Sequence, residues 1–540
     1  MNKSTYTEKV KHLLNDTTKY KQIKKDLTTT LQNQNNTLVK KWGNNGYISP
    51  SLSKSLSIHN SLPPKIYGLP KIHKPNIPLR PIISHTQSPL YNLSKHLSQI
   101  LSNIINKNPY YTKNSFELKK ELDSLHIPTD HKLFSLDVIS LYTNIPTTLV
   151  PEIIKEKWQL IEPHTCIPKD EFLNAIKLTL ETCYFQFENS FYQQIDGVAM
   201  GSPISSTIAQ IVMEYLEEKI LNNNKYNISI FKRYVDDCLI IAQEQEIQKI
   251  LSDFNNFHEN IQFTLETETN NKINFLDITI IRESNTLKTK LYRKETNSDR
   301  ILDYNSNHSK QHKKAIIVNY IDRTLKLTSP KYRPIAIQET ITLLTKNNYP
   351  LTHVKKILKQ RTYKLYNTTD TKNKKQESIT YIPLPYIPTL SEKIEKILKP
   401  HTNIKLAYKP HVQIKQLYSK LKSPTPKNDK SHVVYEIPCN DCEGVYIGQT
   451  QQKLIDRLKG HKYSKTQTAL HKHIVTNKHT FNFNETKILD TEKNKKTREF
   501  LEMIHIKQNE NAINDRTDIK NLNKIYSTLI SNTKQTAQQI

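Results

Sequence analysis

Two adjacent aspartates between two apolar runs constrain the fold of this chain more than any other feature. Residues 228–242 read Ile-Ser-Ile-Phe-Lys-Arg-Tyr-Val-Asp-Asp-Cys-Leu-Ile-Ile-Ala, which predicts a β-hairpin with Asp236 and Asp237 at its tip. Adjacent carboxylates repel each other unless a cation lies between them, and hard oxygen ligands suit Mg²⁺. Most Asp-Asp pairs are solvated surface turns, but the apolar runs on both sides favour a metal site here.

A third carboxylate, Asp137, ends the β-prone run Lys-Leu-Phe-Ser-Leu that begins at Lys132. Three carboxylates on neighbouring strands can hold two metal ions roughly 3.5–4 Å apart for in-line phosphoryl transfer, which is polymerase chemistry. Tyr142 follows closely enough for its ring to wall the sugar of an incoming nucleotide. A core aromatic is the alternative interpretation of Tyr142.

Three ordered motifs resemble the palm of a reverse transcriptase. They are Asp137 with the tail Leu-Tyr-Thr-Asn-Ile-Pro, residues 197–203 (Gly-Val-Ala-Met-Gly-Ser-Pro) and residues 233–237 (Arg-Tyr-Val-Asp-Asp). Residues 67–74 and 78–84 resemble the finger motifs of one branch, the Penelope-like retroelements. The resemblance implies a multidomain α+β protein built as a right-hand polymerase with fingers, palm and thumb. It also implies that the three carboxylates, Asp137, Asp236 and Asp237, bind Mg²⁺ (or Mn²⁺).

The basic stretch 65–84 is punctuated by prolines and rich in β-formers, which favours a finger hairpin over a helix. Lys71, Lys74 and Arg80 are candidates for holding the triphosphate or the template backbone. Arg80 is the strongest of the three, because a guanidinium binds phosphate bidentately and its match to the finger motif is close. A solvated charged loop is the alternative for each lysine.

Glycine is scarce, with only eight in the chain, so each is expected where backbone geometry or a close approach requires it. Five of the eight lie within motifs: Gly68, Gly197, Gly201, Gly444 and Gly448. In the loop 197–203, Gly201 is expected to let the backbone approach the templating base pair. Ser202 is predicted to cap the following helix, with Pro203 at its first position.

Composition indicates a nucleic-acid partner and excludes other classes. The net charge is +28 over 540 residues, and lysines interleaved with tyrosines favour nucleic acid over a membrane surface. No run of eighteen apolar residues and no signal peptide are present, so no membrane partner is expected. Only five cysteines occur, which excludes a disulfide scaffold. The expected location is nuclear, inferred from function, after synthesis in the cytoplasm, and the oligomeric state stays open.

The domain boundaries follow from the motifs and from changes in composition. Residues 273–281 and 287–294 predict two late palm strands, and Asp277 within the first of them is assigned a structural role. The short amino terminus suggests a truncated form, because the resemblance implies further basic sequence ahead of it. The predicted units are a helical part of the fingers (1–60), fingers and palm (61–300), a helical thumb (301–398), a linker (399–430), a second module (431–520) and a tail (521–540).

The second module begins with two predicted strands and a helix-patterned stretch in which Arg457 and His461 share one face. This pattern resembles a GIY-YIG nuclease with Tyr435 and Tyr446 as its paired tyrosines, although Val433 replaces the first glycine of the signature. The resemblance implies a small α/β domain with one divalent metal.

The resemblance also assigns roles within this module. A glutamate on a later helix holds the metal, and Glu502 is preferred to Glu499 because its spacing to Ile506 and Asn514 fits better. Tyr446 or His461 would help to deprotonate water, and Arg457 would stabilise the phosphorane. Ordinary packing or a surface ion pair is the alternative for each of these residues.

Two thiols and two imidazoles in the same module predict a closed structural zinc site. The ligands are Cys439 and Cys442 in a Cys-x-x-Cys motif, with His473 and His479. The Penelope-like resemblance also implies a zinc finger within the nuclease. His471 competes with His473, and spacing alone leaves both open.

Together these features predict a bifunctional retroelement protein. The nuclease would nick target DNA and expose a primer end, and the polymerase would extend that end with dNTPs along a template RNA. Two alternatives stay open. One is a truncated or domesticated, inactive copy that only binds nucleic acid. The other is a plain polymerase of group II intron or telomerase type, whose carboxyl-terminal module only anchors DNA.

Overall fold

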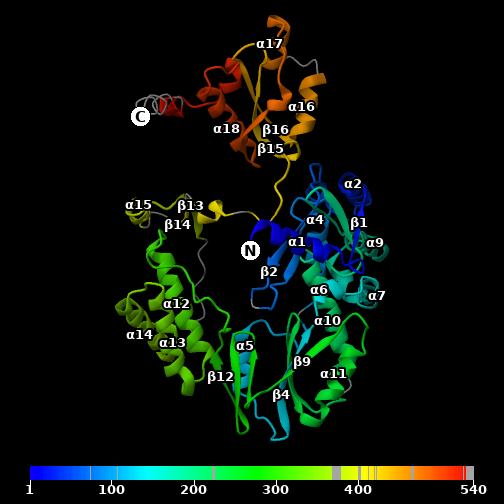
Figure 1. The fold of residues 1–540 in the computed structure, drawn as a ribbon, viewed down its shortest axis with the longest axis vertical. Helices are drawn as coiled ribbons and strands as arrows, with labels where there is room; N and C mark the ends of the chain where they lie inside the picture. Colours follow the sequence, from blue (N-terminus) through cyan, green and yellow to red (C-terminus); the bar gives the residue numbers. More distant parts are fainter. Residues whose placement is uncertain are drawn as a thin grey trace.

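The computed structural model describes residues 1–530 except for a few positions and short segments. The exceptions are His73, Asn106, 222–224, 368–378, Lys399, 401–402, 411–412, Ser419, Leu421, 464–467 and Ser527. Residues 531–540 of the predicted tail also lie outside the described residues. In Figure 1 the palm strands lie at the bottom, the thumb helices on the left and the carboxyl-terminal module at the top.

The predicted palm contains a four-stranded antiparallel sheet in the order β7-β8-β4-β9. Its strands are β7 (Ile228–Tyr234), β8 (Asp237–Gln243), β4 (His131–Val138) and β9 (Phe263–Thr267). Alternate residues of β8 enter two different cores, because side chains of a strand alternate between its faces. Ile240 lies in the helical core, whereas Leu239 and Ile241 lie in the core beneath β10–β12. This burial on both faces explains the uninterrupted apolar run 238–242.

Helices cover the first face of the palm and extend into the fingers. Their apolar stripes form the largest core, with Trp42, Leu97 and Ile208 among its fully buried members. The helices of this layer are α2 (Thr28–Asn44), α3 (Pro50–Leu56), α4 (Tyr91–Leu101), α6 (Leu141–Asn144), α7 (Leu149–Glu156), α8 (Trp158–Ile161), α9 (Lys169–Glu181), α10 (Ser205–Leu221) and α11 (Ile247–Asn255).

The fingers contain a five-stranded sheet in the order β1-β6-β5-β2-β3, covered by α1 (Lys3–Leu14). The predicted hairpin is present, with β2 pairing antiparallel to β3. The strands are β1 (Tyr20–Ile23), β2 (Lys65–Pro70), β3 (Leu79–Ser84), β5 (Tyr184–Phe187) and β6 (Ser190–Gln194).

The second face of the palm packs beneath a three-stranded sheet and α5 (Ser115–Asp123). The prediction of one strand over 273–281 is wrong: the stretch is a hairpin of β10 (Lys272–Phe275) and β11 (Ile278–Glu283), followed by β12 (Thr286–Leu291). The chain reverses at Leu276, which has a φ of 52°. No glycine or proline marks this reversal, so the local sequence gives no turn signal.

Three helices form the predicted thumb region around a core that includes Ile317, Leu344 and Val354. They are α12 (Lys310–Leu327), α13 (Arg333–Lys346) and α14 (Leu351–Asn367). No helix within the described ranges is long and apolar enough to cross a membrane.

The predicted boundary at residue 398 falls inside a paired unit. β13 (Thr380–Pro385) pairs in parallel with β14 (Ile404–Lys409), and α15 (Leu390–Leu398) connects them. Residues 404–409 are therefore a strand rather than part of a linker. The following segment contacts the fingers, because the Lys65 ammonium donates to the Ser423 and Pro424 carbonyls over 3.1 and 2.8 Å.

The carboxyl-terminal module is a three-stranded antiparallel sheet in the order β16-β15-β17 with helices around it. Its core includes Val433 and Tyr435 on one face of β15, and Val434 on the other. The elements are β15 (Ser431–Pro438), β16 (Val445–Lys453), α16 (Leu454–Tyr463), α17 (Ala469–Asn477), β17 (Lys487–Thr491) and α18 (Lys495–Gln508).

Candidate active site

The two-aspartate turn is the tip of the β7–β8 hairpin, as the sequence predicted. Tyr234 pairs with Asp237 across it, and Val235 has a φ of 58°. Asp137 lies opposite Asp237 in the β4–β8 register, so the third carboxylate reaches the turn from the central strand. A positive φ is unfavourable for a β-branched residue, so the fold holds this turn against local preference.

Burial and the neighbouring negative charges raise the pKa of two of the three carboxylates. Burial, and then the charges of Asp236 and Asp137, raise the pKa of Asp237 to about 6. Burial and the Asp236 charge also raise the pKa of Asp137. The structure contains three converging oxygen ligands with excess negative charge, which is the donor chemistry that fits Mg²⁺ or Mn²⁺.

A cavity of about 540 Å³ opens beside the carboxylates and is lined by Asp137, Asp237 and Lys294 among others. The Lys294 charge opposes the rise in the pKa of Asp137 and Asp237. The sequence did not single out Lys294, because nothing distinguishes it locally among 79 lysines and arginines. Asp277 also lines the cavity, but it accepts from Ser115 Oγ and pairs with Arg323 at 2.9 Å, which supports a structural role.

The finger cations face the carboxylates. Burial and the charges of Lys74 and Arg80 lower the pKa of Lys71, and the Asp137 charge opposes that shift. The fold therefore gathers Lys71, Lys74 and Arg80 near one another, with Lys71 and Lys74 near Asp137. Of the three, Lys74 and Arg80 are exposed.

Tyr142 lies between the two groups of charges. Its ring is packed against the palm core, and its pKa is raised by burial and by Asp236 but lowered by Arg80. The core-aromatic interpretation and the predicted place beside the nucleotide site are therefore compatible.

The glycine loop 197–203 joins the palm to the fingers. A Cβ on Gly197 (φ 77°) would lie 2.6 Å from the Thr143 carbonyl, and one on Gly201 (φ 117°) would lie 2.4 Å from the Ile83 carbonyl oxygen. The close approach that Gly201 permits is thus to strand β3, whereas the predicted reason was approach to a base pair. Ile83 N–H donates to the Met200 carbonyl over 2.8 Å, which fixes the loop on β3.

The predicted helix start at Ser202 and Pro203 is wrong, because α10 begins at Ser205. Ser202 belongs to a turn in which its N–H donates to the Ala199 carbonyl over 3.1 Å. Ser205 Oγ donates to the same carbonyl over 2.7 Å. Pro203 also disfavours helical geometry at Ser202, which delays the first helical turn.

The predicted residues of the second module converge on one buried hydroxyl. Tyr435 Oη lies 2.7 Å from His461 Nε2 and accepts from Arg457 Nε over 3.1 Å. The Tyr446 ring lies 5.2 Å from the His461 ring. A Cβ on Gly448 would come within 2.8 Å of Tyr435 Oη, so a glycine is required at that position.

Glu502, rather than Glu499, faces this cluster. Burial and then the Asp518 charge raise the pKa of Glu502 to about 7, and Arg457 opposes the shift. Glu499 instead pairs with Lys495 at 3.6 Å, and its side chain is 43% exposed. Burial and the Arg457 charge lower the pKa of His461 to about 4, so its imidazole is neutral at physiological pH. Asp518 was not predicted from the sequence, because it lies beyond the recognisable motifs.

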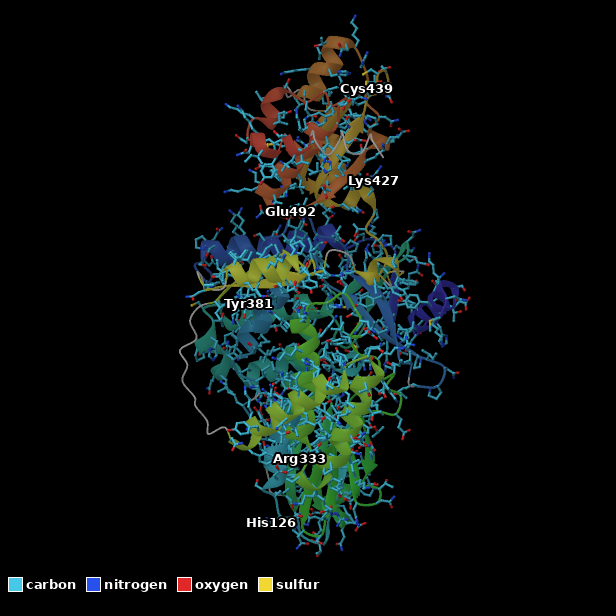
Figure 2. The ribbon with its side chains drawn as sticks, turned by 90° about the vertical axis from the view of Figure 1, so that its left-hand side faces the viewer. His126, Arg333, Tyr381, Lys427, Cys439 and Glu492 are labelled. Atoms are coloured by element: carbon cyan, nitrogen blue, oxygen red, sulfur yellow. The ribbon has the colours of Figure 1, made fainter. Side chains whose placement is uncertain are left out.

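The four predicted zinc ligands also meet. One ligand atom from each of Cys439, Cys442, His473 and His479 lies within 4.8 Å of the others. Two thiols with two imidazoles at this separation fit a tetrahedral zinc site. The structure selects His473, because His471 is not in the group. Figure 2 shows Cys439 toward the end of the module that is farther from the polymerase, and Glu492 at the nearer end.

The comparisons with known families agree with the carboxylate site. Residues 72–280 match the reverse transcriptase (RNA-dependent DNA polymerase) family, so the chain contains a reverse transcriptase domain. Residues 300–359 match the animal helix-turn-helix domain family, which covers α12, α13 and the first half of α14. The comparison with curated proteins found no match.

Solved polymerase structures show distant similarity. Telomerase from Candida albicans, in complex with a fragment of telomeric RNA, is 14% identical with a TM-score of 0.42 over 61% of this chain and 59% of that one. Telomerase from Candida tropicalis is 14% identical with a TM-score of 0.35 over 56% of each chain. The BmCPV RNA-dependent RNA polymerase is 13% identical with a TM-score of 0.37 over 63% of this chain and 32% of that one. Similarity at this level adds nothing to the family match.

Proposed function

We propose that this chain is the RNA-directed DNA polymerase of a Penelope-like retroelement, coupled to a GIY-YIG endonuclease that nicks DNA to prime synthesis. The observation that carries the polymerase half is the convergence of Asp137, Asp236 and Asp237 opposite the finger cations. The reverse transcriptase family match spans the same residues.

In the polymerase, the three carboxylates would hold Mg²⁺, which when bound activates the primer hydroxyl and neutralises the leaving pyrophosphate. Arg80, with Lys71 and Lys74, would hold the triphosphate of the dNTP. The Tyr142 ring would limit the space beside its sugar. The loop at Gly201, Ser202 and Pro203 would lie under the templating base pair.

The cluster around Tyr435 supports the nuclease half. His461 is neutral and hydrogen-bonded, so it is suited to accept a proton from water, directly or with Tyr446. Arg457 would stabilise the phosphorane charge. Glu502 would hold one Mg²⁺, which lowers the pKa of bound water. The Cys439, Cys442, His473 and His479 site would hold a structural Zn²⁺ that fixes this module.

The partners that follow are a template RNA, primer and target DNA, and dNTPs, which fit the net charge of +28. Work on chromosomal DNA would place the protein in the nucleus.

The test is RNA-templated primer extension with Mg²⁺, together with nicking of supercoiled DNA. Asp236→Asn should abolish extension and leave nicking intact, and Glu502→Ala should do the reverse. Asp253→Asn is the matched control, because Asp253 carries a surface ion pair with Lys225 and takes no part in the site. Extension by Asp236→Asn at the wild-type rate would refute the polymerase assignment.

The same assays distinguish the alternatives. A folded wild-type protein that binds RNA without synthesis or nicking in Mg²⁺ or Mn²⁺ would identify an inactive binding copy. Synthesis without any nicking would identify a plain polymerase whose carboxyl-terminal module only anchors DNA.

A further inference from the structure

A buried ion pair lies directly behind the two-aspartate turn. Arg233 precedes the turn on β7, and Glu217 lies on α10; the side chains of both are 0% exposed. Arg233 Nε and Nη2 donate to the two Glu217 carboxylate oxygens, the second over 3.2 Å. Asn108 Nδ2 donates to Glu217 Oε2 over 2.8 Å, so the carboxylate is fixed from a third side.

The remaining guanidinium nitrogen connects this pair to the turn itself. Arg233 Nη1 donates to Gln210 Oε1 over 2.9 Å and to the Val235 carbonyl over 3.0 Å. Val235 is the residue with the unfavourable φ of 58°. Such a conformation is strained and persists only where the surroundings impose it. A further bond to the turn, from Val138 N–H to the Asp236 carbonyl, is longer at 3.4 Å.

Arg233 acts from the face of the sheet opposite the catalytic cavity. It pairs with Cys238, whose side chain lies in the helical core, whereas Asp237 lines the cavity on the other face. Within the described part of the chain, the guanidinium therefore hydrogen-bonds to the main chain of the turn and to no residue that lines the cavity. Its influence on the cavity passes through the turn. A buried ion pair also adds little net stability compared with apolar residues of the same volume. Stability alone does not account for this arrangement.

We infer that Arg233 is a positioning residue, held by Glu217 and Gln210, that sets the place of the Asp236–Asp237 carboxylates and so the affinity of the polymerase site for divalent metal. The inference rests on the proposed polymerase function. It predicts an effect on metal binding and on kcat, and none on the KM for primer–template, because Arg233 does not line the cavity.

The test compares Arg233→Lys with Arg282→Lys in the full chain. Lysine keeps the charge opposite Glu217, but a single ammonium cannot span the four acceptor oxygens of Glu217, Gln210 and Val235 that the guanidinium fork reaches. Arg282 is the matched control, because it forms a comparable two-pronged, nearly buried pair with Glu268 and does not contact the turn. Gln210→Leu is a milder second variant that removes one anchor of Nη1 and leaves the ion pair in place.

Mn²⁺ binding is followed by electron paramagnetic resonance. The Mn²⁺ that wild type binds and Asp236→Asn does not bind is assigned to the polymerase site. Arg233→Lys should weaken this binding and lower kcat by about tenfold to a hundredfold, because small displacements of catalytic groups have effects of that size. Gln210→Leu should also weaken Mn²⁺ binding and lower kcat, by a smaller factor than Arg233→Lys. Arg282→Lys should change neither the Mn²⁺ affinity nor kcat, although it should lower the Tm by an amount similar to that in Arg233→Lys.

Equal Mn²⁺ affinity in Arg233→Lys and wild type, or equal losses in Arg233→Lys and Arg282→Lys, would overturn the inference. The Mn²⁺ measurement needs no synthesis. A wild-type protein that binds Mn²⁺ at Asp236 but makes no DNA would thus refute the proposed function, while the comparison of variants still decides the role of Arg233.

Discussion

Asp237 carries the largest electrostatic strain of the carboxylate site. Its pKa of about 6 means that the fold favours its protonated form, through burial and through the charges of Asp236 and Asp137. In the unfolded chain, the pKa of this carboxyl would be the ordinary value of about 3.9. The folded state therefore binds more protons between about pH 4 and 6, and the metal-free protein loses stability as pH rises through that window.

Asp237→Asn should consequently raise the Tm of the metal-free protein at pH 7.5 and have almost no effect at pH 4, where the wild-type carboxyl is already protonated when folded. Tryptophan fluorescence is the appropriate signal, because the two tryptophans, Trp42 and Trp158, both belong to the core of the polymerase. The same Tm difference at both pH values would contradict the assigned repulsion.

Glycines show how far residue-level prediction reaches. Their scarcity correctly marked Gly201 and Gly448 as constrained, and both have no room for a side chain. What each glycine approaches was not predictable. Gly201 lies against β3 and Gly448 against the Tyr435 hydroxyl, and both neighbours are distant in sequence.

Helix α14 presents an exposed basic surface in the predicted thumb. Lys355, Lys356 and Lys359 are exposed on it, and Tyr363 has 69% of its surface accessible. The buried side is formed by Val354 and Ile357. This division is typical of a helix that packs on its neighbours and meets a phosphate backbone with its outer side.

Replacing Lys355, Lys356 and Lys359 by glutamine should weaken primer–template binding without altering its sequence preference. The slope of log K against log salt concentration should become less steep by about 2 to 3, because each phosphate contact contributes about 0.9. Fluorescence anisotropy over a salt series measures this slope. Lys290→Gln is the control, since Lys290 is engaged with Glu339. An unchanged slope in the triple variant would show that α14 does not contact the duplex.

Element prediction succeeded where periodicity and turn signals agreed. The 228–242 hairpin has both apolar flanks and a polar tip, and it forms as expected. The reversal at Leu276 has no such signal and was missed, because the packing of β10–β12 on the palm decides it. The parallel pairing of β13 with β14 was missed because the two partners are separated along the chain by α15.

At the scale of the whole molecule, we expect the cluster of Cys439, Cys442, His473 and His479 to make the carboxyl-terminal module dependent on its own metal. Its ligands come from the β15–β16 connection and from residues in and after α17. The core of this module is small, and a closed zinc site supplies folding energy directly. The polymerase core, which contains both tryptophans, shares no residue with it.

Cys439→Ser should therefore reduce the zinc content from one ion per chain to none and abolish nicking, while leaving primer extension and the tryptophan-monitored Tm unchanged. Zinc is measured by atomic emission on the purified chain. Cys166→Ser is the control, because Cys166 is an exposed thiol outside the cluster. Retained zinc in Cys439→Ser, or a loss of extension equal to the loss of nicking, would contradict this independence.

The sequence by itself determined which side chains are candidates for the chemistry. Local patterns sufficed for Asp137, the Asp236–Asp237 hairpin, the Tyr435 cluster and the choice of cysteines, because each is a short motif with its own periodicity or spacing. The tertiary structure placed His473 rather than His471 with the two cysteines, and it placed Glu502, which the spacing had favoured, beside the Tyr435 cluster. It alone brought Lys294, Asp518 and the Arg233–Glu217 pair into place. These contacts join residues far apart along the chain, and only the packing of one element on another fixes which face of a helix or strand meets the site.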